Sequence, residues 1–213
     1  MTSFEQHILE AQRAADSGDL EKAESHLSGA LTIADQLEAN DKKRFLAREM
    51  LADLRQRQGR VNEAENFLKE AVEVRKLRYG PFHQRYAEGL QNLSSYYFEN
   101  ERFADAEQLS RMVLKILEKL FGVDSEEAGH VAGQLADTTH ELGNYQDAEA
   151  LYIRAIRIRK SFAGAADPEA VYLIQRYAAL LEDTGRDDEA GHMRASAQGK
   201  ISGIIKALKP LVE

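Results

Sequence analysis

A repeated phrase constrains this 213-residue chain more than any other feature. The phrase has an alanine at its centre and recurs at intervals of 41, 42, 42 and 42 residues. A unit of this size cannot bury its apolar face alone and must stack on its neighbours, so a fixed period predicts a repeat array. The repeated alanines are Ala23, Ala64, Ala106, Ala148 and Ala190.

Other fixed positions in the repeat indicate helices. Five residues before each alanine stands a glycine, except in the third unit, which has Glu101. Glycine suits the left-handed residue that ends a helix, because it has no Cβ to clash. Twelve residues before and seven residues after each alanine the residue is again mostly alanine, with apolar residues at helical spacing between. This pattern predicts two closely packed helices in each unit.

The repeat uses almost the whole chain and predicts one domain. No linker rich in serine, glycine or proline divides it. At this length a chain can bury one large continuous core. We therefore expect an all-α fold of about five antiparallel helix pairs over residues 1–213. The approximate repeats are 4–44, 45–86, 87–128, 129–170 and 171–208, with a C-terminal tail over 200–213.

Two segments resemble a known repeat. Residues 90–97 (LQNLSSYY) resemble the first-helix pattern of the tetratricopeptide repeat, and residues 148–155 (AEALYIRA) resemble its second-helix pattern. The period is about eight residues longer than the usual 34-residue unit and is similar to that of kinesin light chains. The resemblance implies a right-handed α-solenoid, the tetratricopeptide superhelix, in which the first helix of each unit lines a concave groove. Such arrays are implied to be protein-binding scaffolds.

Composition narrows the expected partners. The 28 basic and 36 acidic residues give a net charge of −8, which disfavours binding to a nucleic-acid backbone. Basic clusters at 75–78 and 154–160 are expected to be solvated, with an anionic partner as the alternative. No stretch approaches the roughly 18 apolar residues of a membrane span. The N-terminus lacks a signal-peptide pattern, and the chain has no cysteine, so we expect a cytoplasmic protein without disulfides.

No catalytic or cofactor motif is present in the sequence. The histidines form no HExxH pair. His130 and His140 lie about 15 Å apart along one predicted helix, too far to share a metal. Asp137 and Glu141 stand four residues apart on one helix face, where we favour a solvated groove wall over a catalytic carboxylate pair. We therefore expect neither enzyme activity nor a bound metal or cofactor.

The resemblance also implies which side chains face the groove. Small polar side chains with a few aromatic rings suit an extended peptide, because amides bond its backbone and rings form pocket walls. Asn92 matches the second asparagine of the family's L-N-N-L motif, which faces the bound peptide; the alternative is a hydrogen bond to a neighbouring helix. The implied groove residues are Glu49, Asp53, Glu88, Gln91, Asn92, Ser95, Phe98, His130, Gln134, Asp137, Glu141, Tyr172 and Arg176.

One specialisation of the family, the carboxylate clamp for chaperone tails, is not matched. Of its five cationic or amide positions only Asn92 fits, and the others are occupied by Glu49, Asp53, His130 and Gln134. An acidic groove would repel a C-terminal carboxylate. The expected partner is therefore a protein or peptide with a basic or neutral segment.

The C-terminal tail carries an apolar stripe on one helical face. We expect a capping helix that covers the last repeat, and a homodimer seam or docking surface is the alternative. The predicted function is thus a non-catalytic interaction scaffold, with a self-assembling structural protomer as the alternative. The stripe consists of Ile201, Ile204, Ile205 and Leu208.

Overall fold

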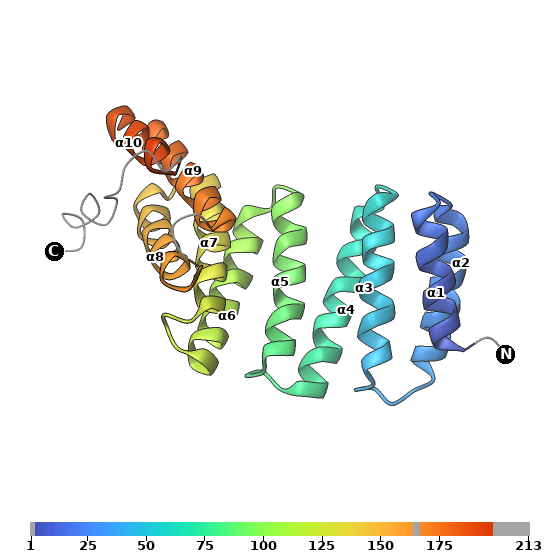
Figure 1. Cartoon of the computed structure of the whole chain (residues 1–213). Helices are drawn as coiled ribbons and strands as arrows, with labels where there is room; N and C mark the ends of the chain where they lie inside the picture. The colour runs from blue at the N-terminus through green and yellow to red at the C-terminus, as the bar shows by residue number, and fades with distance from the viewer. Residues whose placement is uncertain (1–2, 164–166, 198–213) are drawn as a thin grey trace. The chain divides into compact units, whose positions relative to one another are not determined.

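The structure is a computed structural model that describes residues 3–163 and 167–197. Over these residues the chain forms ten α-helices and no strand (Figure 1). The all-α class predicted from the repeat is therefore confirmed. The helices are α1 (Phe4–Asp16), α2 (Leu20–Asp35), α3 (Lys42–Arg57), α4 (Val61–Tyr79), α5 (Gln84–Glu99), α6 (Phe103–Phe121), α7 (Glu126–Glu141), α8 (Tyr145–Ala163), α9 (Pro168–Asp183) and α10 (Asp187–Ala197).

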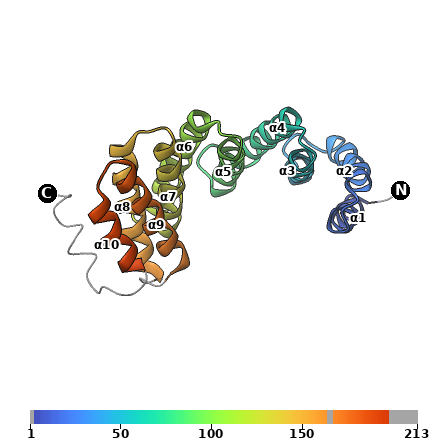
Figure 2. The same ribbon diagram turned by 90° about the horizontal axis from the view of Figure 1, so that it is seen from above.

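The chain divides into two compact units, Met1–Tyr96 and Tyr97–Glu213. In the first unit α1 packs on α2 and α3 on α4, and in the second unit α7 packs on α8 and α9 on α10. Within the first unit, α1 and α3 lie on one side and α2 and α4 on the other (Figures 1 and 2). The single domain over 1–213 stays a prediction. The apolar stripe of the tail, and with it the capping helix and the homodimer, lies outside the described residues.

The repeated alanines mark the closest helix packing. All five have 0% of their surface exposed. The small residues twelve positions earlier are also buried, from Ala136 and Ala178 at 0% to Ser94 at 6%. A methyl group at these points lets two helix backbones approach, whereas a larger side chain would hold them apart. The residues that repeat in the sequence are therefore the residues that repeat in the core.

The short turn within each unit needs a left-handed residue. Gly18, Gly59, Gly143 and Gly185 have φ between 73° and 80°. Glu101, in the same column of the third unit, has φ 58° and is the only non-glycine with positive φ among the described residues. An L-residue in this conformation costs about 1–2 kcal/mol. The glycine column thus reflects a backbone requirement, which the third unit meets with some strain.

A partly buried ion pair ties α2 to α3. The guanidinium of Arg55 on α3 lies 2.7 Å from a carboxylate oxygen of Glu24 on α2, and the Arg55 side chain is only 8% exposed. The Gln58 amide also donates to Glu24, at 3.0 Å. The hydrogen bond from Arg55, followed by that from Gln58, lowers the pKa of Glu24 from 4.5 to about 2. The folded protein therefore favours the ionised carboxylate.

Glu24→Gln is expected to destabilise the protein at neutral pH but much less in acid. Because the folded pKa lies below the unfolded value, the carboxylate contributes stability above about pH 4.5, and this contribution is lost as the pH falls towards 2. The Glu24 side chain is 31% exposed, so solvent screening limits the expected loss to about 1–2 kcal/mol at pH 7. Urea denaturation at a series of pH values measures it.

The matched control is Glu73→Gln, which changes an exposed carboxylate on α4. Its unfolding free energy is expected to stay within about 0.5 kcal/mol of wild type. A gap between wild type and Glu24→Gln that stays constant from pH 7 to acid would contradict the role given to this ion pair.

Candidate functional site

A cavity of about 390 Å³ lies between α1 and α3 in the first unit. We call it the α1–α3 groove. Its floor is apolar. It consists of four buried apolar side chains, those of Ala11, Ala23, Leu27 and Leu54. Its remaining walls mix apolar and charged side chains. The full lining is Ala11, Gln12, Ala15, Asp16, Ala23, Leu27, Leu46, Glu49, Met50, Asp53, Leu54 and Arg57.

The rim of the α1–α3 groove is predominantly acidic. Three carboxylates, those of Asp16, Glu49 and Asp53, line it together with one cation, Arg57. Asp53 and Arg57 form an ion pair at 2.9 Å, but both side chains are more than half exposed. Because both side chains are exposed, solvent screens this pair and it contributes little to stability. Both charges are also accessible to a ligand. Asp16 is exposed and has no ion pair within the described part of the chain.

Glu49 is held in the groove wall by a buried arginine. Arg75 on α4 donates from Nε at 2.8 Å and from Nη2 at 3.0 Å to the two oxygens of Glu49. The guanidinium also lies 4.1 Å from the centre of the Phe45 ring. Arg75 is 6% exposed, so the expectation of a solvated basic face is wrong for this residue. Its charge is satisfied inside by a bidentate carboxylate and an aromatic face.

Helix α5 carries the predicted groove residues Glu88, Gln91, Asn92 and Ser95. The amide Nδ2 of Asn92 donates to Glu49 at 3.4 Å. This is a hydrogen bond to a neighbouring helix, the alternative considered for Asn92, although its side chain stays exposed. Glu88 accepts from Arg85 at 2.9 Å. Gln91 is partly buried and Ser95 is exposed.

A second cavity, of about 310 Å³, adjoins the α1–α3 groove, since Gln12 and Leu46 line both. Leu9 and Leu46 form exposed apolar walls, at 47% and 38% exposure. Lys42 and Lys43 also line this cavity. The surface along α1 and α3 therefore runs from lysines at the start of α3 to carboxylates at the far end of α1 and along α3.

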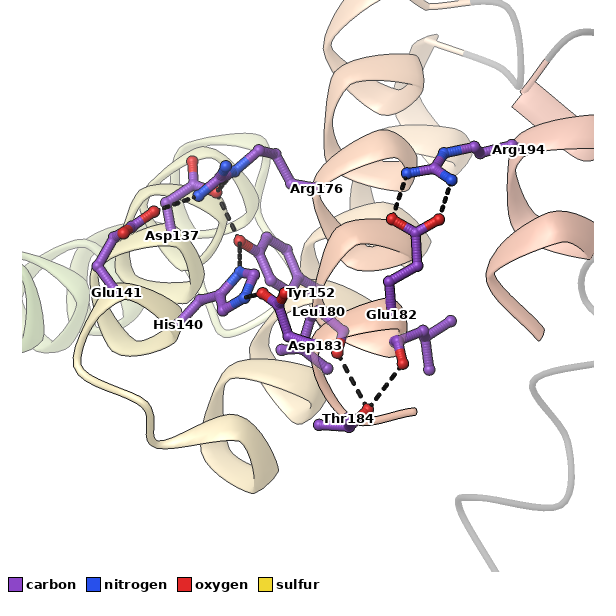
Figure 3. A network of polar contacts seen from close by, with 11 residues as sticks. Asp137, His140, Glu141, Tyr152, Arg176, Leu180, Glu182, Asp183, Thr184 and Arg194 are labelled. Atoms are coloured by element: carbon purple, nitrogen blue, oxygen red, sulfur yellow. Dashed lines mark hydrogen bonds and ion pairs between the residues drawn. The ribbon is translucent and has the colours of Figure 1, made fainter. Parts of the chain in front are cut away.

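In the second unit, four predicted groove residues join one polar network, and Figure 3 shows three of them, Asp137, Glu141 and Arg176. Asp137 on α7 accepts from the hydroxyl of Tyr152 at 2.6 Å and from that of Tyr172 at 2.9 Å. Arg176 on α9 donates to Asp137 and to Glu141, both at 2.8 Å. Asp137 is only 8% exposed. The solvated wall expected at Asp137 is thus wrong, because side chains from α8 and α9 cover it.

The protonation states of this network support a structural role. Burial, followed by the charge of Asp137, raises the pKa of Tyr172 to about 12 and also raises the pKa of Tyr152. Burial alone would lower the pKa of Arg176, but the hydrogen bonds to Asp137 and Glu141 outweigh it and raise that pKa. Both hydroxyls therefore stay protonated and Arg176 stays charged at neutral pH. The tyrosine hydroxyls and the Arg176 guanidinium donate their hydrogen bonds to the neighbouring carboxylates of Asp137 and Glu141.

The remaining predicted residues of the second unit pair locally. The Nδ1 atom of His130 lies 2.6 Å from a carboxylate oxygen of Glu169. Phe98 packs edge-on against Phe103, with the ring centres 5.3 Å apart. Gln134 is partly buried.

Within residues 3–163 and 167–197, no group of three or more histidine or carboxylate side chains could hold a metal ion. No helix in these ranges is long and apolar enough to cross a membrane.

Several lining residues of the α1–α3 groove were missed from the sequence. Gln12 and Asp16 lie eleven and seven residues before Ala23, the columns that Asp53 and Arg57 occupy before Ala64. Extending those columns to the first unit would have found both. Leu46 and Met50 could not be found in this way, because a search for polar side chains passes over apolar walls.

The family follows from a direct comparison. Residues 11–76, 44–119 and 89–161 each match the family model described as tetratricopeptide repeat. The chain therefore belongs to the tetratricopeptide repeat family, as the resemblance predicted. No curated protein matches the sequence significantly.

Solved structures share the fold at low sequence identity. A Podosopora anserina putative kinesin light chain with nearly identical TPR-like repeats is 20% identical over 98% of this chain and 96% of its own, with a TM-score of 0.77. BtubC (BKLC) from P. vanneervenii is 24% identical over 93% and 82%, with a TM-score of 0.74. A Rap protein complexed with competence and sporulation factor is 12% identical over 92% and 54%, with a TM-score of 0.63. These similarities confirm the helical-repeat fold.

Proposed function

We propose that this protein is a non-catalytic protein–protein interaction scaffold that holds a peptide or helical segment of its partner in the α1–α3 groove. Its membership of the tetratricopeptide repeat family favours a scaffold. The observation that carries the proposal is the cavity of about 390 Å³ with an apolar floor and an acidic rim. Concave sites with apolar walls and a few fixed polar groups are typical of ligand binding.

The groove chemistry favours a segment with an apolar side chain next to a basic one. The apolar side chain would displace water from the floor at Leu27 and Leu54. The basic side chain would lie between Asp16 and Asp53, where the carboxylates are accessible. Charges at an interface rim select partners and speed association more than they add affinity. An acidic segment would be disfavoured by the same carboxylates.

A structural neighbour supports the general mode of action. The Rap protein with this fold was crystallised in complex with competence and sporulation factor. A protein that contains a helical-repeat array of this kind can therefore hold a bound factor. For this chain, we propose that the bound segment contacts α1 and α3, with Glu49 fixed by Arg75 as a preformed acceptor.

Peptides selected from a random display library on the full chain should be enriched in basic residues beside apolar ones. For a selected peptide, Asp53→Lys is expected to weaken binding about tenfold, because it reverses a charge at the rim. Fluorescence anisotropy measures the affinity. The matched control is Glu73→Lys, the same charge reversal on α4, which does not line the groove.

Two results would contradict this proposal. One is enrichment of acidic peptides over basic ones in the selection. The other is equal binding of the selected peptides by Asp53→Lys and by Glu73→Lys, which would show that the peptides bind elsewhere.

A further inference from the structure

Two histidines face each other between α1 and α2, outside the lining of the α1–α3 groove. The Nδ1 atoms of His7 and His26 lie 3.4 Å apart. The ring centres are 5.6 Å apart and the ring planes are inclined by 57°. Both residues are partly exposed. The pair is therefore reachable from solvent, and its two Nδ1 atoms face each other.

We propose that His7 and His26 together bind one divalent transition-metal ion that prefers imidazole nitrogen, such as Zn²⁺, Ni²⁺ or Cu²⁺. Adjacent ligands lie closer together at the square-planar centres that Cu²⁺ and Ni²⁺ prefer, whereas metal–imidazole bonds of about 2.0–2.1 Å at the tetrahedral centre that Zn²⁺ prefers place two ligand nitrogens roughly 3.3–3.4 Å apart. The Nδ1 atoms already have this separation. A tetrahedral ion can therefore enter after a small rotation of the two rings, with little movement of either helix, and water takes the remaining coordination positions.

The metal-free state explains why the two rings stay together. A neutral imidazole has one protonated and one free nitrogen, so one Nδ1 can donate its proton to the other. When a metal ion enters, this proton leaves Nδ1 and the same ring takes up a proton at Nε2 from solvent, so both Nδ1 atoms bind the ion and both imidazoles stay neutral. The preference for Ni²⁺, Cu²⁺ and Zn²⁺ over Mg²⁺ follows from the nitrogen ligands, because Mg²⁺ favours oxygen.

Gly29 on α2 leaves room for the His7 ring. A Cβ built on Gly29 would lie 2.5 Å from Cε1 and 2.9 Å from Nδ1 of His7. The imidazole thus rests directly on the backbone of α2, in space that a methyl group would fill. This contact restricts the ring before the metal arrives and reduces the entropy lost on binding. The bound ion would cross-link α1 to α2 and stabilise the first helix pair by mass action.

Isothermal titration calorimetry on the full chain tests the proposal. The protein is first stripped of metal with a chelator and is then titrated separately with NiCl₂, CuSO₄, ZnCl₂ and MgCl₂. We expect one equivalent of each transition metal to bind, with no saturable binding of Mg²⁺. His7→Ala and His26→Ala are each expected to lower the affinity at least tenfold. His192→Ala, which removes an exposed histidine on α10, should leave it unchanged.

A second variant separates positioning from ligand loss. Gly29→Ala keeps both imidazoles but displaces His7, so metal affinity is expected to fall about tenfold while circular dichroism shows the helix content of wild type. The metal-induced rise in Tm should shrink in parallel. The proposal is overturned by an absence of saturable binding, by wild-type affinity in His7→Ala or His26→Ala, or by wild-type affinity in Gly29→Ala.

Discussion

Asp137→Ala is expected to lower the free energy of unfolding by about 2–4 kcal/mol. The substitution removes the acceptor for two tyrosine hydroxyls and for Arg176. Tyr152 is fully buried, and its hydroxyl would be left with the distant His140 nitrogen at 3.5 Å. Arg176 keeps Glu141 as a partner, which limits the loss on that side. Denaturant unfolding measures the change, and hydrogen exchange in α7 to α9 locates it.

The double variant Asp137→Ala/Tyr152→Phe distinguishes an orphaned hydroxyl from a general packing defect. Without the Tyr152 hydroxyl, Asp137→Ala should cost about 1–2 kcal/mol less, because no buried donor is left unpaired. Asp53→Ala is the control, since Asp53 occupies the same repeat column but its side chain is 63% exposed. We expect it to change stability by at most about 0.5 kcal/mol. Equal losses for Asp137→Ala and Asp53→Ala would refute the structural role of the network.

The column that contains Asp53 and Asp137 shows what the repeat pattern can predict about a side chain and what it cannot. Both residues stand eleven positions before a buried alanine, so both were correctly placed on the first helix of a unit. Their environments differ because the partners of Asp137 include Tyr172 and Arg176, which lie 35 and 39 residues further along the chain. A repeat column gives the position of a side chain on its helix. It does not give the side chains that the next unit brings against it.

The same limit applies to Arg75 and to the histidine pair. Arg75 reads as one member of a basic cluster, but Glu49 and Phe45 on α3 bury its charge. His7 and His26 are separated by 19 residues, and their contact depends on Gly29, a glycine inside a helix. Composition and spacing gave no reason to pair them. Of the residues that line the α1–α3 groove, Glu49 and Asp53 were named from the repeat columns, but the depth between two helices is not visible in a sequence.

Gly129→Ala and Gly191→Ala are expected to change stability in opposite directions. Alanine usually improves a helix interior by up to about 1 kcal/mol over glycine. A Cβ on Gly191 meets nothing within 4 Å, so Gly191→Ala should raise the unfolding free energy by about 0.5–1 kcal/mol. A Cβ on Gly129 would lie 2.5 Å from Cγ2 and 2.9 Å from Cβ of Ile158.

Ile158 cannot yield easily, because it is 1% exposed and its Cβ is fixed to the backbone of α8. Helix α7 must therefore move away from α8, and overpacking of this kind costs about 1–3 kcal/mol, more than the helix propensity returns. Thermal and urea unfolding of the two variants gives the signs. If Gly129→Ala were as stabilising as Gly191→Ala, α7 and α8 would have room to separate freely. Close packing would then not be the reason for glycine at this position.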